Sequence, residues 1–357
     1  MAVGKNIVFK IIFIPVIFVI GVFTLINFLP KEDDGAKSES FIESLKGDET
    51  KASPFPFEDL TIPYLAKREY KSALGSLNEV SRNSNYTSYL TGYDSDGFRI
   101  NGLLTIPNVI DPQGDRRKYP AVIFIHGYIA PAQYKTLVNY ASYVDYLAKN
   151  GFVVFKIDLR GHADSEGEPG GAYYSSDYII DVLNARAALA SSDFVNADKV
   201  GLWGHSMAGN VVFRSLAAKG DIPAAVIWAG AVYSYEDFQQ FSINDDSYRP
   251  PDTNAERARK RRELFNTYGE FSADSDFWQK VPATNYLNNI KGAIQIHHAA
   301  NDDVVDINYS RNLSSILDKT SIPHELYEYT SGGHNLTGDS FNLAMQRTVD
   351  FFREHLR

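Results

Sequence analysis

A serine with small residues on either side is the first candidate for chemistry in this sequence. Ser206 lies within residues 200–209, with Gly204 two positions before it and Ala208 two positions after it. A sharp turn from a strand into a helix exposes such a serine, and larger side chains at these two positions would collide in the turn. The pattern therefore predicts a nucleophile at Ser206, with Ala208 in the place of the more usual glycine.

A serine hydroxyl is a poor nucleophile at neutral pH, so a histidine must accept its proton. For a serine on this kind of turn, the acid and then the histidine follow it along the chain. His334 lies in a loop of sequence SGGHN after the last predicted strand, from which it could reach back to the serine. We therefore predict His334 as the base. The other histidines between Ser206 and the final helix are His297, His298 and His324.

The acid that orients this histidine is expected in the segment after the predicted strand at residues 293–297. Three carboxylates compete there, Asp302, Asp303 and Asp306. Asp302 is favoured because the two valines that follow would fold back against the sheet and leave it directed toward the histidine. Asp303 is the alternative acid, or else caps the next helix or faces solvent. Asp306 is interpreted as a helix N-cap.

Two backbone N–H groups are expected to stabilise the oxyanion that acyl transfer creates. The first belongs to Met207, directly after the nucleophile. The second belongs to Tyr128, where Gly127 lets the chain turn tightly after the run at residues 121–125. His126 is interpreted as a structural residue.

The elements that position these residues alternate along the chain. Short, continuously apolar runs are typical of strands that are buried on both faces, and amphipathic stretches between them predict helices. This alternation predicts a mostly parallel sheet with flanking helices, preceded by an antiparallel pair of strands at residues 86–93 and 98–106. The remaining predicted strands are 121–125, 152–157, 200–203, 224–229, 293–297 and 324–329, and the predicted helices are 137–149, 177–191, 207–219, 307–319 and 341–355.

Composition narrows the possible chemistry. The 357 residues are 44% hydrophobic and can bury one large core, and the net charge of −9 makes nucleic acid an unexpected partner. The chain has no cysteine, which excludes a thiolate nucleophile, a disulfide framework and a Cys-ligated metal. Since no His-x-x-x-His or comparable spacing suggests metal ligands, we expect neither a metal nor a cofactor.

The N-terminus carries a targeting feature. Residues 11–29 contain no charge, follow Lys5 and Lys10, and have about the length of a membrane-spanning helix. The lysines predict that the following chain lies outside the cytoplasm. We expect a membrane anchor at residues 1–30, a polar stalk at 31–58 and the main domain at 59–357. The alternative is a signal peptide whose cleavage would release a secreted protein.

Together, these residues resemble the α/β-hydrolase superfamily, and within it the prolyl-oligopeptidase-like (S9) serine peptidases and the dienelactone-hydrolase-like esterases. The resemblance covers about residues 86–355. It implies a catalytic triad of Ser206, Asp302 and His334, and a structural loop at 158–162 in which Arg160 forms ion pairs. The motifs that carry it are HG at 126–127, DLRGH at 158–162, GHSMAG at 204–209, residues 296–305 and GH at 333–334.

Two departures from the S9 peptidases bear on the substrate. Those enzymes carry a large β-propeller before the hydrolase domain, for which the residues before 86 leave no room. They also usually place a tyrosine after the serine, whereas Met207 resembles esterases and acyl hydrolases. We therefore expect a small-molecule ester or a short peptide as substrate. The alternative is a non-catalytic binding module on the same fold; oligomeric state stays open.

Residues 233–287 are expected to form a helical cap that selects the substrate, because this connection is longer than an ordinary one. It contains a basic stretch at residues 256–263, which either clamps an acidic group of the substrate or forms a solvated helix face. Phe277 and Trp278 either close over the pocket or pack within the cap.

Overall fold

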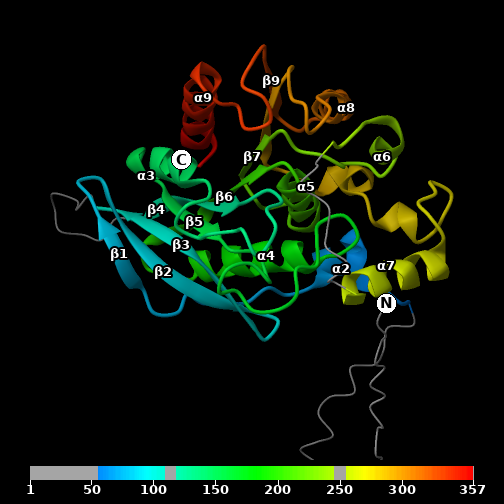
Figure 1. Cartoon of the computed structure of the whole chain (residues 1–357), viewed down its shortest axis with the longest axis horizontal. Coiled ribbons are helices and arrows are strands. Elements are labelled where there is room, and N and C mark those ends of the chain that lie inside the picture. The colour runs from blue at the N-terminus through cyan, green and yellow to red at the C-terminus, as the bar shows by residue number, and fades with distance from the viewer. Residues whose placement is uncertain (1–54, 109–117, 245–254, 357) are drawn as a thin grey trace, which may run out of the picture. The chain divides into compact units, whose positions relative to one another are not determined.

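The computed structural model describes residues 55–108, 118–244 and 255–356 (Figure 1). One compact unit extends from Pro54 to Arg357. The predicted anchor at residues 1–30 and nearly all of the predicted stalk lie outside the described residues. Within the described ranges, no helix has the length and apolar character needed to cross a membrane.

The described residues form a nine-stranded sheet in the order β1-β2-β3-β5-β4-β6-β7-β8-β9. Strands β1 to β3 are antiparallel, β3 also pairs antiparallel with β5, and all other neighbours are parallel. The sheet confirms the predicted fold class. The strands are β1 Asn78–Arg82, β2 Tyr86–Ser95, β3 Phe98–Pro107, β4 Tyr119–Ile125, β5 Val153–Ile157, β6 Val195–His205, β7 Ala224–Trp228, β8 Ala293–Ala299 and β9 His324–Tyr329.

Helices cover both faces of this sheet (Figure 1). Side chains of β4 alternate between two cores: Ile123 and Ile125 pack with helices α4, α5 and α8, while Val122 and Phe124 pack with α3 and α9. This alternation explains why the central strands are apolar throughout. The helices are α2 Ile62–Lys67, α3 Ala141–Lys149, α4 Asp177–Ala190, α5 Ala208–Ala218, α6 Asp237–Gln240, α7 Ala255–Tyr268, α8 Asn308–Leu317 and α9 Asp339–His355, with short 3₁₀ turns η1 Glu58–Leu60, η2 Trp278–Lys280 and η3 Ala283–Asn289.

Helix α3 begins later than the sequence predicted. Its N-cap residue Tyr140 has φ 60°, so the chain before it cannot continue the helix. Residues 135–139 instead form a turn in which the backbone N–H of Lys135 donates to Oδ1 of Asn139 at 2.7 Å. The buried Lys156 of β5 holds this turn, because its Nζ donates to the carbonyl oxygen of Asn139 at 2.8 Å.

The segment predicted as a cap contains α6, α7, η2 and η3, while residues 245–254 lie outside the described residues. Its aromatic side chains form a separate small core. Trp278 is fully buried in this core, and Phe277 stacks on Tyr268 with ring centroids 3.8 Å apart. In the basic helix α7, Arg261 is exposed, and its guanidinium lies 4.6 Å from the ring centroid of Tyr174, which precedes α4 and lies outside the predicted cap.

Candidate active site

Ser206 occupies the sharp turn between β6 and α5. Its φ of 55° is in the left-handed region, which is costly for a residue with a Cβ. The turn is held because the Ser206 N–H donates to the carbonyl oxygen of Trp228 at 2.9 Å. At Gly204, an added Cβ would lie 2.7 Å from Val212 and 3.0 Å from the carbonyl oxygen of Ala208. Small residues are therefore required around this serine, which is partly exposed between buried neighbours.

Asp302 and His334 lie together on the loops after β8 and β9. Nδ1 of His334 is 2.8 Å from Oδ2 of Asp302. The other carboxylate oxygen, Oδ1, accepts hydrogen bonds from the backbone N–H groups of Val304 and Val305 at 2.9 and 3.0 Å. The two valines thus hold the carboxylate through their backbone, and Asp302 is directed at the imidazole of His334.

The other two carboxylates of this segment lie elsewhere. Asp303 is exposed. Oδ1 of Asp306 accepts from the N–H of Asn308 at 2.9 Å, at the start of α8. The formal N-cap position of α8 is Ile307, so Asp306 bonds the first turn from one residue further out than predicted.

A further histidine shares the carboxylate of Asp302. Nε2 of His298 lies 3.1 Å from Oδ2 of Asp302, and its Nδ1 lies 2.7 Å from Oγ of Ser310. The side chain of His298 is fully buried at the end of β8. The contact of His298 with Asp302 was not predicted from the sequence, in which His298 is one of several histidines after Ser206.

The electrostatics of Asp302 keep it ionised. Burial alone raises the pKa of this carboxyl group, but the hydrogen bonds from His298 and His334 outweigh that effect and lower its pKa well below the ordinary value. A charged carboxylate at this position stabilises a positive charge on His334, which is what a base needs when it accepts a proton.

His205, directly before the serine, joins three loops. Its Nε2 lies 2.9 Å from the carbonyl oxygen of His334, and its Nδ1 lies 2.7 Å from the hydroxyl of Tyr140. That hydroxyl accepts the N–H of Gly127 at 3.0 Å. Burial and the neighbouring His334 lower the pKa of His205 to about 3, so its imidazole is neutral. Sequence reasoning missed both His205 and Tyr140.

The two predicted oxyanion donors flank this arrangement. Met207 is buried at the N-cap of α5, and Tyr128 follows Gly127 at the end of the β4 loop. Gly127 is needed for close approach rather than for its φ angle, since an added Cβ would lie 2.9 Å from the Tyr140 hydroxyl and 3.1 Å from Nδ1 of His205. Donation to an oxyanion by Tyr128 and Met207 stays a prediction.

The residues interpreted as structural make structural contacts. His126 is fully buried; its Nδ1 lies 2.7 Å from the carbonyl oxygen of Gly127, and its Nε2 accepts the Leu159 N–H at 3.3 Å. Arg160 forms ion pairs with Asp181 at 2.6 Å and Asp177 at 3.2 Å. Both residues therefore fix the loop at 158–162 beside the site.

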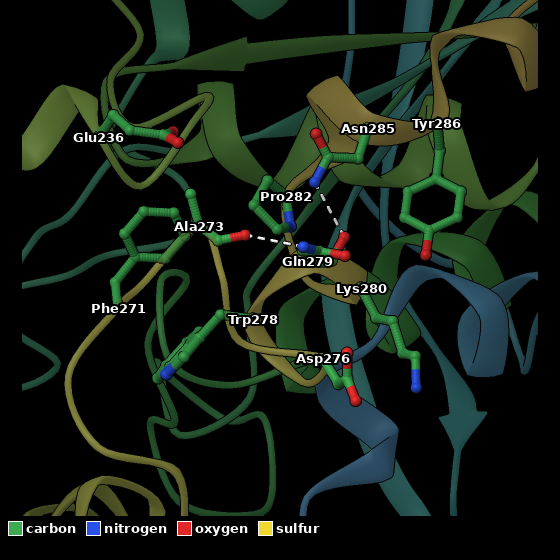
Figure 2. Close-up of a pocket in the computed structure, with 10 residues that line it drawn as sticks. All are labelled: Glu236, Phe271, Ala273, Asp276, Trp278, Gln279, Lys280, Pro282, Asn285 and Tyr286. Atoms are coloured by element: carbon green, nitrogen blue, oxygen red, sulfur yellow. Dashed lines mark hydrogen bonds between the residues drawn. The ribbon is translucent and has the colours of Figure 1, made fainter.

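A cavity of about 590 Å³ lies within the cap segment (Figure 2). Glu236 lies on one side of it, away from Asp276 and Lys280. Among the lining residues, Nδ2 of Asn285 donates to the carbonyl oxygen of Gln279 at 2.9 Å. None of the predicted catalytic residues lines it. The lining residues are Glu236, Phe271, Ala273, Asp276, Trp278, Gln279, Lys280, Pro282, Asn285 and Tyr286.

Among the described residues, no group of His, Cys, Asp or Glu side chains could hold a metal ion.

Comparison with known proteins agrees with this fold. Residues 117–244 match the family described as serine aminopeptidase, S33. Dipeptidyl peptidase 8 of Mus musculus is 26% identical over 273 residues, which cover 73% of this chain and 28% of the relative. The human dipeptidyl peptidase 8 matches over the same length, with 27% of it covered. The chain thus spans just over a quarter of the curated relatives that it matches.

Solved structures of esterases and peptidases share the fold. Acetyl xylan esterase 1 from Thermoanaerobacterium sp. superposes with a TM-score of 0.56 at 17% identity, covering 81% of this chain and 90% of the esterase. A puromycin-hydrolyzing peptidase from Mycobacterium tuberculosis superposes with a TM-score of 0.60 at 16% identity, covering 77% of this chain and 40% of the peptidase. The sheet order, the sharp turn at Ser206 and these similarities agree on an α/β-hydrolase fold for this chain.

Proposed function

We propose that this chain cleaves an ester or a small amide or peptide bond through an acyl-enzyme intermediate, with Ser206 as nucleophile, His334 as base and Asp302 as the orienting acid. The observation that carries the proposal is the 2.8 Å contact between His334 and Asp302. It leaves Nε2 of His334 as the nitrogen available to a substrate hydroxyl or to Ser206. The hydrogen bond from His205 to the His334 carbonyl supports it, because it joins the serine turn to the base loop.

The proposed reaction has two halves. Oγ of Ser206 attacks the substrate carbonyl carbon while Nε2 of His334 accepts the hydroxyl proton, and the resulting imidazolium is stabilised by Asp302. The N–H groups of Met207 and Tyr128 stabilise the oxyanion. Collapse breaks the bond to the alcohol or amine, which leaves with the proton from His334. A water molecule then attacks the acyl-enzyme with His334 again as base, releasing the acid and restoring Ser206.

The substrate class follows from the similar proteins and from the residue after the serine. The similar structures act, by their names, on acetylated xylan and on puromycin, which contain an ester and an amide. Met207 favours esterases over S9 peptidases. We therefore propose small esters as the preferred substrates and short aminoacyl amides as slower ones.

The test is labelling of the full-length chain with a fluorophosphonate, which reacts with activated serines, beside Ser206→Ala. Ser192→Ala is the matched control, because its hydroxyl only bonds backbone carbonyl groups at the end of α4. We expect labelling of the wild type and the control but not of Ser206→Ala, with faster turnover of p-nitrophenyl acetate than of aminoacyl p-nitroanilides. A folded wild-type protein without labelling would contradict the proposal and favour a binding module.

We further propose that residues 11–29 anchor the chain and leave the hydrolase domain outside the cytoplasm. The uncharged stretch after Lys5 and Lys10 supports this proposal. Extraction of cell membranes with alkaline carbonate tests it, together with N-terminal sequencing of the mature protein. We expect the full-length chain to stay with the membrane. A mature N-terminus beyond residue 29 would instead show a cleaved signal peptide.

A further inference from the structure

Three loops that the proposed reaction needs are joined by one partly buried chain of hydrogen bonds. It runs from the N–H of Gly127 to the hydroxyl of Tyr140, from there to Nδ1 of His205, and from Nε2 of His205 to the carbonyl oxygen of His334. The three contacts measure 3.0, 2.7 and 2.9 Å. The chain thus begins beside the predicted oxyanion donor Tyr128, passes directly before the nucleophile and ends on the predicted base.

The bonding pattern permits one arrangement of protons. A backbone N–H can only donate, so the Tyr140 oxygen accepts from Gly127 and its single proton points to His205. Nδ1 of His205 is then the acceptor, and the ring proton is on Nε2. The His334 carbonyl can only accept, so it receives that proton. Every donor in the chain is matched to an acceptor, and reversing any one of them would leave a polar atom unsatisfied.

Packing holds the two side chains at the centre of this chain. His205 is 2% exposed, and the Tyr140 ring packs edge-on against Phe124 with centroids 5.4 Å apart. An added Cβ on Gly127 would collide with both the Tyr140 hydroxyl and His205. The three groups therefore have almost no freedom to rearrange independently.

We infer that Tyr140 and His205 are positioning residues that hold the oxyanion loop at Gly127 and the base at His334 in register with Ser206. The inference rests on the proposed function. Neither residue is assigned contact with the substrate. Their effect is on distance and angle, to which acyl transfer is sensitive because reacting groups must be held within a fraction of an ångström.

A purely structural role makes a different prediction, and Tyr143 provides the comparison. It lies on α3, one turn after Tyr140, and its hydroxyl donates to the carbonyl oxygen of Asn335 at 2.8 Å. Tyr143 therefore bonds the same loop, one residue from His334, but does not reach Gly127. If the hydroxyl of Tyr140 matters only for stability, its removal should resemble the removal of the hydroxyl of Tyr143.

The first experiment compares Tyr140→Phe and Tyr143→Phe in the full-length chain. We expect Tyr140→Phe to lower kcat for p-nitrophenyl acetate and the fluorophosphonate labelling rate by about 10- to 100-fold, with KM changed less than about threefold. Tyr143→Phe should lower kcat less than about threefold. It should shift the urea midpoint by about as much as Tyr140→Phe does. Equal kinetic effects of the two variants would overturn the inference.

The second experiment separates the two bonds of His205. In His205→Gln the amide nitrogen can occupy the place of Nε2 and keep the bond to His334, whereas in His205→Asn the amide oxygen can occupy the place of Nδ1 and keep the bond to Tyr140. Because His205→Gln already breaks the link to Tyr140, adding Tyr140→Phe should reduce kcat less than about threefold further. Tyr140→Phe added to His205→Asn should cost about as much as it costs alone.

Fully additive losses in both pairs would overturn the inference, since additivity means that the two residues act independently. Failure of the proposed function looks different. In that case the wild-type chain itself would not react with the fluorophosphonate at Ser206, whatever the variants do.

Discussion

Oδ2 of Asp302 lies 2.8 Å from Nδ1 of His334 and is separated from it by 32 residues along the chain. The same oxygen lies 3.1 Å from Nε2 of His298, so one carboxylate oxygen receives two imidazole groups. The negative charge of the Asp302 carboxylate therefore holds both imidazole rings, and these contacts offset the cost of burying that charge. The orientation of His334 therefore depends on Asp302 being ionised.

Asp302→Asn should remove most of the activity without unfolding the domain. An amide carries no negative charge and cannot stabilise the imidazolium or enforce the same tautomer of His334, so we expect kcat to fall by about 10³- to 10⁴-fold with little change in KM. Steady-state hydrolysis of p-nitrophenyl acetate measures this. Asp303→Asn is the matched control because Asp303 is exposed. An equal loss in both variants would contradict the assignment of Asp302.

Ser206→Gly should make the protein more stable while it becomes inactive. Ser206 has φ 55°, where glycine is favoured over a residue with a Cβ, so we expect a gain of about 1 kcal/mol in the free energy of unfolding relative to Ser206→Ala. Urea denaturation measures the difference. The glycine and alanine substitutions of Ser215, inside α5, should show the opposite order of stability, because glycine destabilises the interior of a helix relative to alanine. A glycine variant that is no more stable than the alanine variant would show that the turn is not strained.

Gly127→Ala should damage both stability and catalysis. Its Cβ would lie 2.9 Å from the Tyr140 hydroxyl and 3.1 Å from Nδ1 of His205, both of which are held by other bonds. We expect a loss of about 1–3 kcal/mol in the free energy of unfolding and a lower kcat. Gly151→Ala is the control: it is strained by φ +91° but has no atoms within 4 Å of its Cβ. It should lose stability and keep its kcat, and a Gly127→Ala variant with unchanged kcat would contradict the prediction.

The central strands and the mostly parallel character of the sheet could be predicted because their physical signal is local. Strands β4 and β5 pack against cores on both faces, so their apolar runs are visible in the sequence. Strand β1 was missed because all five of its residues are exposed, and only its pairing with β2 at the sheet edge makes it a strand. The start of α3 was misplaced because the left-handed conformation of Tyr140 depends on contacts with the distant β5.

Candidates for the site followed from local patterns too, namely the small neighbours of Ser206 and the loop glycines before His334. How these candidates are held could not be predicted. The bond from His205 to the His334 carbonyl spans 129 residues, and the bond from Tyr140 to His205 spans 65. A single sequence carries no periodic or spacing signal for contacts at such separations. From the sequence, His205 could therefore be recognised only as the residue before the nucleophile.

The stability of the domain should fall as the pH drops below about 6.5, and His297 should contribute to that fall. Burial and the nearby Arg347 lower the pKa of His297 to about 3, so the unfolded chain binds a proton that the folded chain does not. The contribution of neutral His297 to the free energy of unfolding is fully present above the pKa that this histidine has in the unfolded chain, about 6.5. It is lost as the pH falls from 6.5 toward 3, by up to about 1.4 kcal/mol per pH unit. His297→Gln should therefore reduce the slope of unfolding free energy against pH between 6 and 4.5. Urea denaturation at several pH values measures the slope, and a reference series at pH 8, where the imidazole is neutral in both states, gives the cost of losing its bonds to Gln295 and Tyr329. A slope that stays unchanged in the variant would show that His297 takes up its proton without unfolding.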